Sequence, residues 1–209
     1  MRMALVIATC CLVLLGCGKT NPGAKVTNAE SSVKGNAADL SDFSIALPDG
    51  WRVFDLTSKD FETALNQLLK DDPSMSQMAE AVRSLAAQGQ IKLIAFDIAK
   101  AEKDFADNIN VLILPAPANS TLDLLIEGSK TQLEQYIKPE GLKMGRTTIG
   151  GQEFGTAEYI MKQARRLAVW SFFALKGSKT YTFTFTCVDE HSTQFLASVR
   201  EAMSTVVLR

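Results

Sequence analysis

The chain has 209 residues, of which 46% are hydrophobic and 22% are charged, and its formal net charge is −1 at pH 7. This length suits one domain with a full hydrophobic core behind short N-terminal segments. The 22 basic and 23 acidic side chains are mixed along the chain, and no stripe of lysine and arginine alternates with aromatic residues. Composition and charge pattern therefore exclude a nucleic-acid-binding protein.

The N-terminus has the pattern of a bacterial lipoprotein signal peptide. Met1-Arg2-Met3 supplies positive charge, residues 4–15 form an apolar run, and the small residue Gly16 precedes Cys17. The run is shorter than the roughly 20 apolar residues that a membrane-spanning helix needs. We therefore predict a signal peptide over residues 1–16, cleavage between Gly16 and Cys17, and attachment of acyl chains such as palmitate to Cys17. An ordinary secretory signal is the alternative.

The segment that follows is predicted to be a flexible tether over residues 17–41. It is rich in Asn, Ser, Gly, Ala and Lys, it contains no aromatic residue, and it has neither helical nor strand periodicity. A random coil of this length has a root-mean-square reach of roughly 25 to 30 Å. Because Cys10 and Cys11 leave with the signal peptide and Cys17 carries lipid, Cys187 has no partner for an intrachain disulfide.

The remaining residues, 42–209, are predicted to form one domain. Turn signals and apolar periodicity define its elements. In chain order they are a hairpin of strands over 43–47 and 51–54, helices over 57–69 and 72–89, strands over 91–98 and 108–114, a helix over 120–138, strands over 142–149, 152–163, 166–175 and 180–187, and a helix capped by Asp189 whose apolar positions reach Val206. Elements in this order predict an α+β domain, in which helices flank a mainly antiparallel sheet.

Two strands show most clearly how the sheet is covered. The last strand places Tyr181, Phe183, Phe185 and Cys187 on one side and four threonines on the other. The strand over 91–98 has apolar residues on both faces, as expected when both faces are covered. We expect Ile91, Leu93 and Ala95 on one face and Ile94, Phe96 and Ile98 on the other.

One cluster contains groups used in enzymatic chemistry, namely the run Cys187-Val188-Asp189-Glu190-His191. A thiol, an imidazole and a carboxylate are the components of a cysteine nucleophile with its base. However, Cys187 continues the apolar face of its strand, where burial makes a thiol inert. His191 falls in the first turn of the next helix. We therefore predict no catalytic residue, no cofactor and no metal site, since a single histidine and a single free cysteine are too few for a typical zinc site.

Several short motifs resemble the PsbP-like family, which includes photosystem PsbP, the eukaryotic Mog proteins and bacterial DcrB-type lipoproteins. The motifs are Phe43-Ser44-Ile45-x-Leu47-Pro48-x-Gly50-Trp51, the hairpin Thr148-Ile149-Gly150-Gly151-x-x-Phe154, the strand Lys179-Thr180-Tyr181-Thr182-Phe183-Thr184-Phe185, and a closing helix with Phe195, Val199 and Ser204. The resemblance spans most of residues 43 to 207. It implies an α-β-α sandwich and a non-enzymatic binding or assembly role.

Three classes of function follow from these patterns. The leading hypothesis is a lipid-anchored, extracytoplasmic module of the cell envelope, which binds a protein partner or a small hydrophobic ligand. The alternatives are a structural envelope lipoprotein and, less favoured, a hydrolase or thiol enzyme with an unrecognised site. Gly18 lacks the aspartate that retains enteric lipoproteins in the inner membrane, which indicates the outer membrane where that sorting rule applies.

Overall fold

The computed structural model describes residues 37–54, 56, 63, 66, 76–97, 105–162 and 165–209. The predicted signal peptide, the residues of the tether before Ala37, the helix predicted over 57–69 apart from two isolated positions, and the predicted start of the next helix lie outside the described residues.

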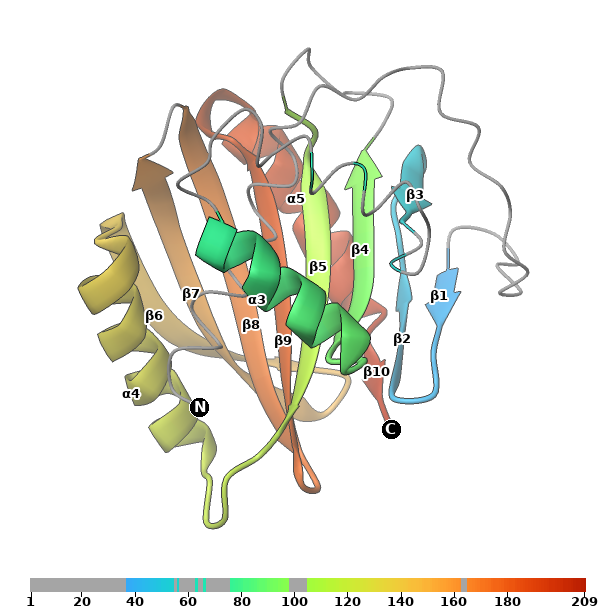
Figure 1. Ribbon diagram of the computed structural model, residues 1–209, viewed down its shortest axis with the longest axis vertical. Helices are drawn as coiled ribbons and strands as arrows, with labels where there is room; N and C mark the ends of the chain where they lie inside the picture. The colour runs from blue at the N-terminus through green and yellow to red at the C-terminus, as the bar shows by residue number, and fades with distance from the viewer. Residues whose placement is uncertain are drawn as a thin grey trace.

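The centre of the domain is a seven-stranded antiparallel sheet (Figure 1). Its strands, in spatial order, are β3 (Trp51–Val53), β4 (Ile91–Asp97), β5 (Asn108–Pro115), β9 (Lys179–Val188), β8 (Arg166–Lys176), β7 (Gln152–Lys162) and β6 (Glu140–Ile149). Strands β6 to β9 pair in sequence order, so the predicted meander is confirmed. The α+β architecture predicted from the order of elements is confirmed as well.

A second, three-stranded sheet consists of β1 (Ala37–Asp39), β2 (Phe43–Ala46) and β10 (Val207–Leu208), with β2 in the middle. The predicted hairpin of β2 and β3 is therefore wrong: β2 pairs with β1 and β10, whereas β3 pairs with β4. The turn at Pro48 carries the chain from one sheet to the other instead of folding it back.

Both ends of the predicted domain also differ from expectation. β1 lies in the part of the chain assigned to the tether, because pairing with β2 orders residues that have no strand pattern of their own. The last helix ends at Ser204, and Val206 follows it rather than extending its apolar stripe. The backbone N–H groups of Thr205 and Val206 close the final turn on the carbonyls of Ala202 and Met203.

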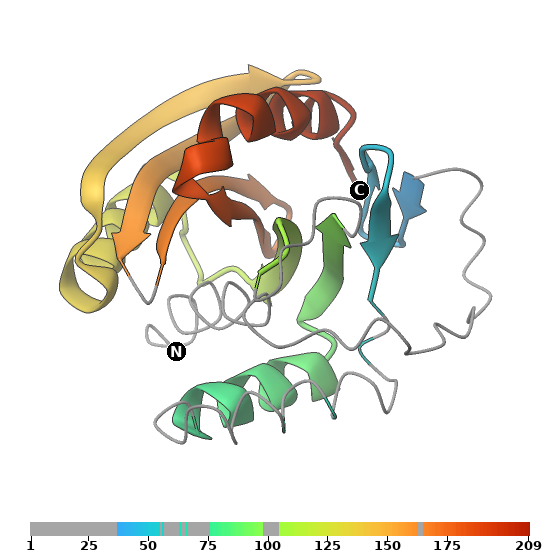
Figure 2. The same ribbon diagram turned by 90° about the horizontal axis from the view of Figure 1, so that it is seen from above.

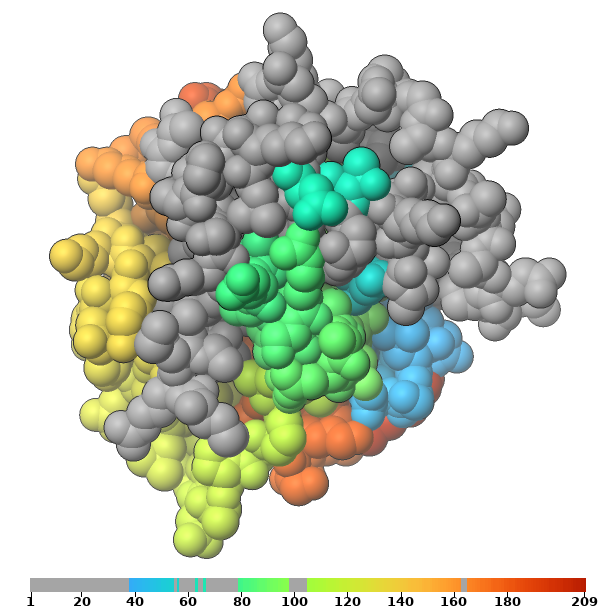
Figure 3. Space-filling model, in the orientation of Figure 1, coloured from blue at the N-terminus to red at the C-terminus, as the bar shows by residue number. Residues whose placement is uncertain are grey.

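Three described helices cover the two faces of the large sheet: α3 (Ser76–Ala87), α4 (Leu122–Gln132), which continues as a π-helical turn over Leu133–Ile137, and α5 (Ser192–Ser204). β6 and β7 curve around α5, while α3 lies on the opposite face (Figure 2). In the space-filling view α3 occupies the middle of that face and α4 lies to one side of it (Figure 3). Figure 1 shows the resulting α-β-α layers.

Local chemistry explains where α4 begins and how it sits on the sheet. The helix is predicted to start at residue 120, but its N-cap is Thr121, whose hydroxyl accepts a hydrogen bond from the N–H of Leu124 at 3.2 Å. Below the helix, a Cβ at Gly155 would lie 2.4 Å from Cγ1 of Ile126. Glycine at position 155 therefore allows α4 to pack directly against β7.

The core is divided by the sheet. The largest cluster lies between the sheet and α5, and contains Tyr181, Phe183, Phe185 and Cys187 of β9, which confirms the predicted apolar face of that strand. In β4 the predicted faces are partly wrong, because a register shift between Ile91 and Leu93 places Ile91 with Ile94 under α3. A bulge of this kind moves one residue to the other face of its strand.

Candidate binding groove between β6 and α5

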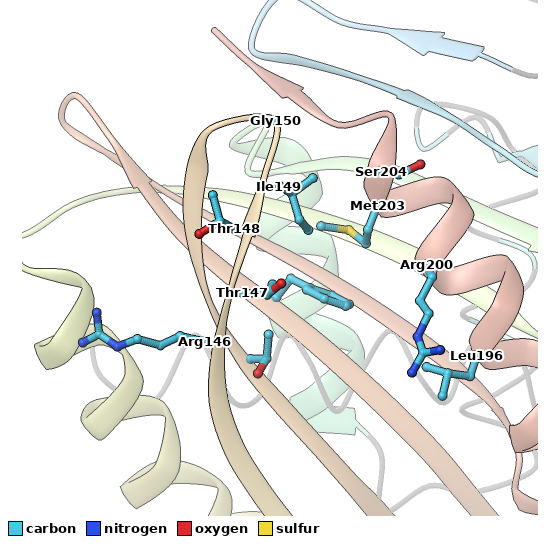
Figure 4. A pocket seen from close by; sticks show the side chains of 11 residues that line it. Arg146, Thr147, Thr148, Ile149, Gly150, Leu196, Arg200, Met203 and Ser204 are labelled. Carbon is cyan, nitrogen blue, oxygen red and sulfur yellow. The ribbon is translucent and has the colours of Figure 1, made fainter.

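A groove of about 430 Å³ lies between the outer strand of the large sheet and the helix that crosses its concave face. Close up, side chains of β6 form one side and those of α5 the other (Figure 4). The lining residues are Arg146, Thr147, Thr148, Ile149 and Gly150 of β6 and its turn, Thr156 of β7, Phe172 of β8, and Leu196, Arg200, Met203 and Ser204 of α5.

The strand wall of the groove follows from side-chain alternation in β6. Ile149 packs against the cluster under α5, so Thr147 and Gly145 face the same side. Gly145 pairs with Thr156, and a Cβ at Gly145 would lie 3.0 Å from the Thr156 hydroxyl. The missing side chain leaves this hydroxyl accessible from the edge of the sheet.

The helix wall combines apolar and charged chemistry. Phe195, Val199 and Ala202 of α5 are buried against the sheet. The next face of the helix places Leu196, Arg200 and Met203 along the groove, since residues three and four apart are neighbours on a helix. The groove therefore offers an apolar floor, several hydroxyl groups and guanidinium charge.

The two arginines of the groove differ in their surroundings. Arg146 points away from α5 and toward α4 in Figure 4. It forms ion pairs with Asp123 and, at 3.0 Å, with Glu153. Arg200 is exposed and forms no ion pair with another described side chain. The uncompensated positive charge of this groove is that of Arg200.

The candidate nucleophile Cys187 is not among the residues that line the groove. Cys187 is a free thiol with no exposed surface, inside the cluster beneath α5. Burial raises the pKa of Cys187, and the nearby carboxylates of Asp107, Asp189 and Glu190 raise that pKa further. A thiol that stays protonated is a poor nucleophile. His191 belongs to a 3-10 turn (Asp189–His191) and is partly buried, rather than lying in the first turn of α5.

Asp189 also has a role that differs from the predicted helix cap. Nε of Arg166 donates to Oδ2 of Asp189 at 3.0 Å, and Nη1 of Arg166 donates to Oε2 of Glu140 at 2.6 Å. These two hydrogen bonds raise the pKa of Arg166, whereas hydrogen bonds from Lys162 and then from Arg166 lower the pKa of Glu140. The charged start of β8 is thus tied to the start of β6 and to the 3-10 turn that precedes α5.

Other predicted sites can be placed only in part. Gly16 and Cys17, the predicted cleavage and lipid-attachment residues, lie outside the described residues. Within the described ranges, no group of three or more His, Cys, Asp or Glu side chains is arranged to hold a metal ion. Among the same residues, no helix has both the length and the apolar composition needed to span a membrane.

The groove itself was not anticipated from the sequence. Thr147 and Arg200 stand in separate elements, and only the curvature of β6 around α5 brings these elements together. The sequence predicts the Gly150-Gly151 turn and the apolar stripe of α5 only as structural features. The one sequence feature that points to the groove is Arg200 beside the apolar stripe of α5. This feature is also common on ordinary solvent-exposed helices.

Comparison with known proteins supports the fold. No family model matches the sequence, and no curated protein matches it. Among solved structures, cyanobacterial PsbP (CyanoP) from Synechocystis sp. PCC 6803 aligns with a TM-score of 0.52 and 13% identity, over 88% of this chain and 99% of that protein. LpqN of Mycobacterium tuberculosis aligns with a TM-score of 0.50 and 9% identity, over 85% of this chain and 87% of that protein. The chain has the α-β-α sandwich fold of PsbP-like proteins, as its sequence motifs predicted.

Proposed function

We propose that this protein is a lipid-anchored, extracytoplasmic module of the cell envelope that binds a protein partner and catalyses no reaction. The observation that carries the binding role is the groove between β6 and α5, where the guanidinium of Arg200, which pairs with no other described side chain, lies above an apolar floor. Such a surface can hold a ligand by apolar contact and orient it by charge. Outside the groove, Asp42, Glu140 and Arg166 form structural ion pairs, and Cys187 is buried.

The comparisons are consistent with this proposal. The solved structure of LpqN is described as that of a protein involved in cell envelope biogenesis, and it shares the fold of this chain. The lipid anchor rests on the sequence pattern that ends at Cys17. An anchor and a tether raise the effective concentration of the groove near membrane partners, so that a weak interaction suffices. Binding of a small hydrophobic ligand in the same groove is the second candidate function, because Leu196, Met203 and Phe172 line the groove.

The binding role is tested by photocrosslinking in living cells. A benzophenone amino acid is placed at Ser204, which lines the groove, and in a matched strain at Gln135, which is exposed on the π-helical turn after α4. We expect one discrete protein adduct from position 204 and none from position 135. Adducts of lipid alone from position 204 would support the ligand reading. Equal labelling from both positions, or none, would contradict a binding groove and favour a structural lipoprotein.

The anchor is tested separately. Cys17→Ser should leave an unprocessed precursor or a product cleaved elsewhere, without acyl mass, because serine cannot form the thioether. We expect the variant to leave the membrane fraction on alkaline extraction, whereas Cys10→Ser and Cys11→Ser should remain there. Acylated, membrane-bound Cys17→Ser protein would refute the anchor. Outer-membrane location, expected where the enteric rule applies to Gly18, is checked by density-gradient separation of the two membranes.

A further inference from the structure

We propose that the partner binds as an extended segment, which adds a strand to the free edge of β6 and places an acidic side chain against Arg200. The proposal rests on the proposed binding function and extends it by naming the mode of binding and the chemistry of the partner. Three features of β6 and α5 support it.

The first feature is the backbone of β6, an outermost strand of the large sheet, which pairs with β7 and with no other described strand. Gly150 and Gly151 both have positive φ, 55° and 80°, as in a two-residue type I′ hairpin loop. In such a loop the flanking residues, Ile149 and Gln152, form a hydrogen-bonded pair. Alternation then directs the backbone N–H and C=O groups of Thr148 away from β7, toward an incoming strand.

The second feature is the placement of the charged side chains that usually block such an edge. Lysine and arginine on edge strands prevent pairing when they extend across the free edge. Here Lys143 is held 3.3 Å from Glu158 of the neighbouring β7. Arg146 is held by Glu153 and by Asp123 of α4. The ion pairs draw both side chains toward β7 and α4, so that neither of them covers the edge beside Thr147 and Thr148.

The third feature is the match between strand and helix spacing. Alternate residues of an added strand would lie about 7 Å apart on the side that faces α5. Arg200 and the partly exposed Leu196 are one turn apart on α5, about 5 to 6 Å between their Cβ atoms. An acidic residue and an apolar residue two positions apart in the partner could therefore contact Arg200 and Leu196 together. Among the described residues that line the groove none is acidic, so Arg200 is available to a carboxylate.

The test separates backbone pairing from side-chain contact, and uses the full-length protein in its membrane with the crosslinker at Ser204. Thr148→Pro removes an outward N–H, a change that an edge strand tolerates, and Thr148→Val is the matched control that keeps it. We expect Thr148→Pro to reduce the protein adduct at least tenfold and Thr148→Val to change it less than twofold. Thermal unfolding of both variants, measured by circular dichroism, establishes that each is folded.

A charge exchange tests the contact with Arg200. We expect Arg200→Glu to reduce the adduct at least tenfold, and replacement of one acidic residue of the captured segment by lysine to restore it. Arg52→Glu, at an exposed position of β3 on the other edge of the sheet, is the control for charge alone. If a protein is captured but neither Thr148→Pro nor the charge exchange affects it, this binding mode is wrong while the binding function stands. Capture of a second copy of this chain would also refute the proposed partner.

Discussion

The two faces of β9 differ in chemistry although both are buried. Toward α5, the strand presents Tyr181, Phe183, Phe185 and Cys187, each at most 2% exposed. Toward the opposite face it presents threonines that pair across the sheet with Asn108, Asn110 and Ser171. Within the described part of the chain, the hydroxyls of Thr184, Thr186 and Ser171 and both amide atoms of Asn110 have no hydrogen-bond partner.

The two faces of β9 therefore show separately how buried apolar and buried polar side chains affect stability. Apolar burial stabilises in proportion to the area removed from water, so the α5 face should account for most of the stability. A buried polar group without a partner costs about 1 to 3 kcal/mol relative to a satisfied one. On the opposite face, replacing an unpartnered polar side chain with an apolar one should therefore leave the free energy of unfolding unchanged or increase it.

The largest effect is expected from a truncation on the α5 face. Phe183 is fully buried and its ring packs edge-on against Phe43 and Phe154, with centroids 5.4 and 6.3 Å apart. Phe183→Ala should reduce the free energy of unfolding by about 3 to 5 kcal/mol through lost contacts and a cavity. Urea denaturation measures the change, with the exposed Val53→Ala as a control. A loss below about 1 kcal/mol would show that this face does not dominate stability.

A smaller effect on the same face is expected at Cys187. Cys187→Ser places a hydroxyl in an apolar environment and should cost about 1 to 3 kcal/mol, whereas Cys187→Ala should cost mainly its cavity. The groove adduct should be unchanged in a folded Ser variant. Rapid labelling of the native thiol by a bulky maleimide, together with lost function in that variant, would overturn the packing role of Cys187.

The attachment of the small sheet depends on pH through Asp42. The hydrogen bond from Lys179 at 2.6 Å lowers the pKa of Asp42, burial opposes this change, and Lys92 at 3.2 Å lowers the pKa further. Because the folded pKa is below the unfolded value, the contribution is present at neutral pH and is lost as pH falls below about 3.8.

The acid effect should be small, less than about 1 kcal/mol, because both lysines are partly exposed and solvent screens the pairs. Denaturation midpoints between pH 2 and pH 6 measure it. Asp42→Asn should remove that part of the acid sensitivity, whereas Asp49→Asn, in the turn before β3, is the control. Identical acid profiles for the wild-type and Asp42→Asn proteins would rule out this role of Asp42.

The smallest effect is expected on the face of β9 that carries the threonines. This prediction tests the difference between the two faces most directly. Thr184→Val replaces an unpartnered hydroxyl with a methyl group of similar shape, so stability should change by less than about 0.5 kcal/mol or increase. The matched control is Thr205→Val, because the Thr205 hydroxyl donates to Ala202 at 2.7 Å and accepts from the N–H of Ala46 at 2.8 Å. Equal losses in both variants would show that Thr184 is satisfied in solution.

The sequence predicts the parts of the fold that depend on local patterns. The alternation of β9, the turn at Gly150-Gly151 and the apolar stripe of α5 are each visible within about a dozen residues. The small sheet is not visible in this way, because Ala37–Asp39 has weak strand propensity and is ordered by its pairing with β2. The groove is likewise non-local, since its charge comes from Arg200 and its open edge from β6.

The three-stranded sheet has a consequence for the order of folding. β2 receives one neighbour from a few residues away, but the other, β10, pairs Val207 with Ser44 from the far end of the domain. Contacts between such distant residues form slowly, because a long loop must close first. A chain synthesised or exported from its N-terminus cannot complete this sheet until Val207 has emerged. Until then the backbone of β2 lacks one partner, and assistance from a chaperone would be most useful at that stage.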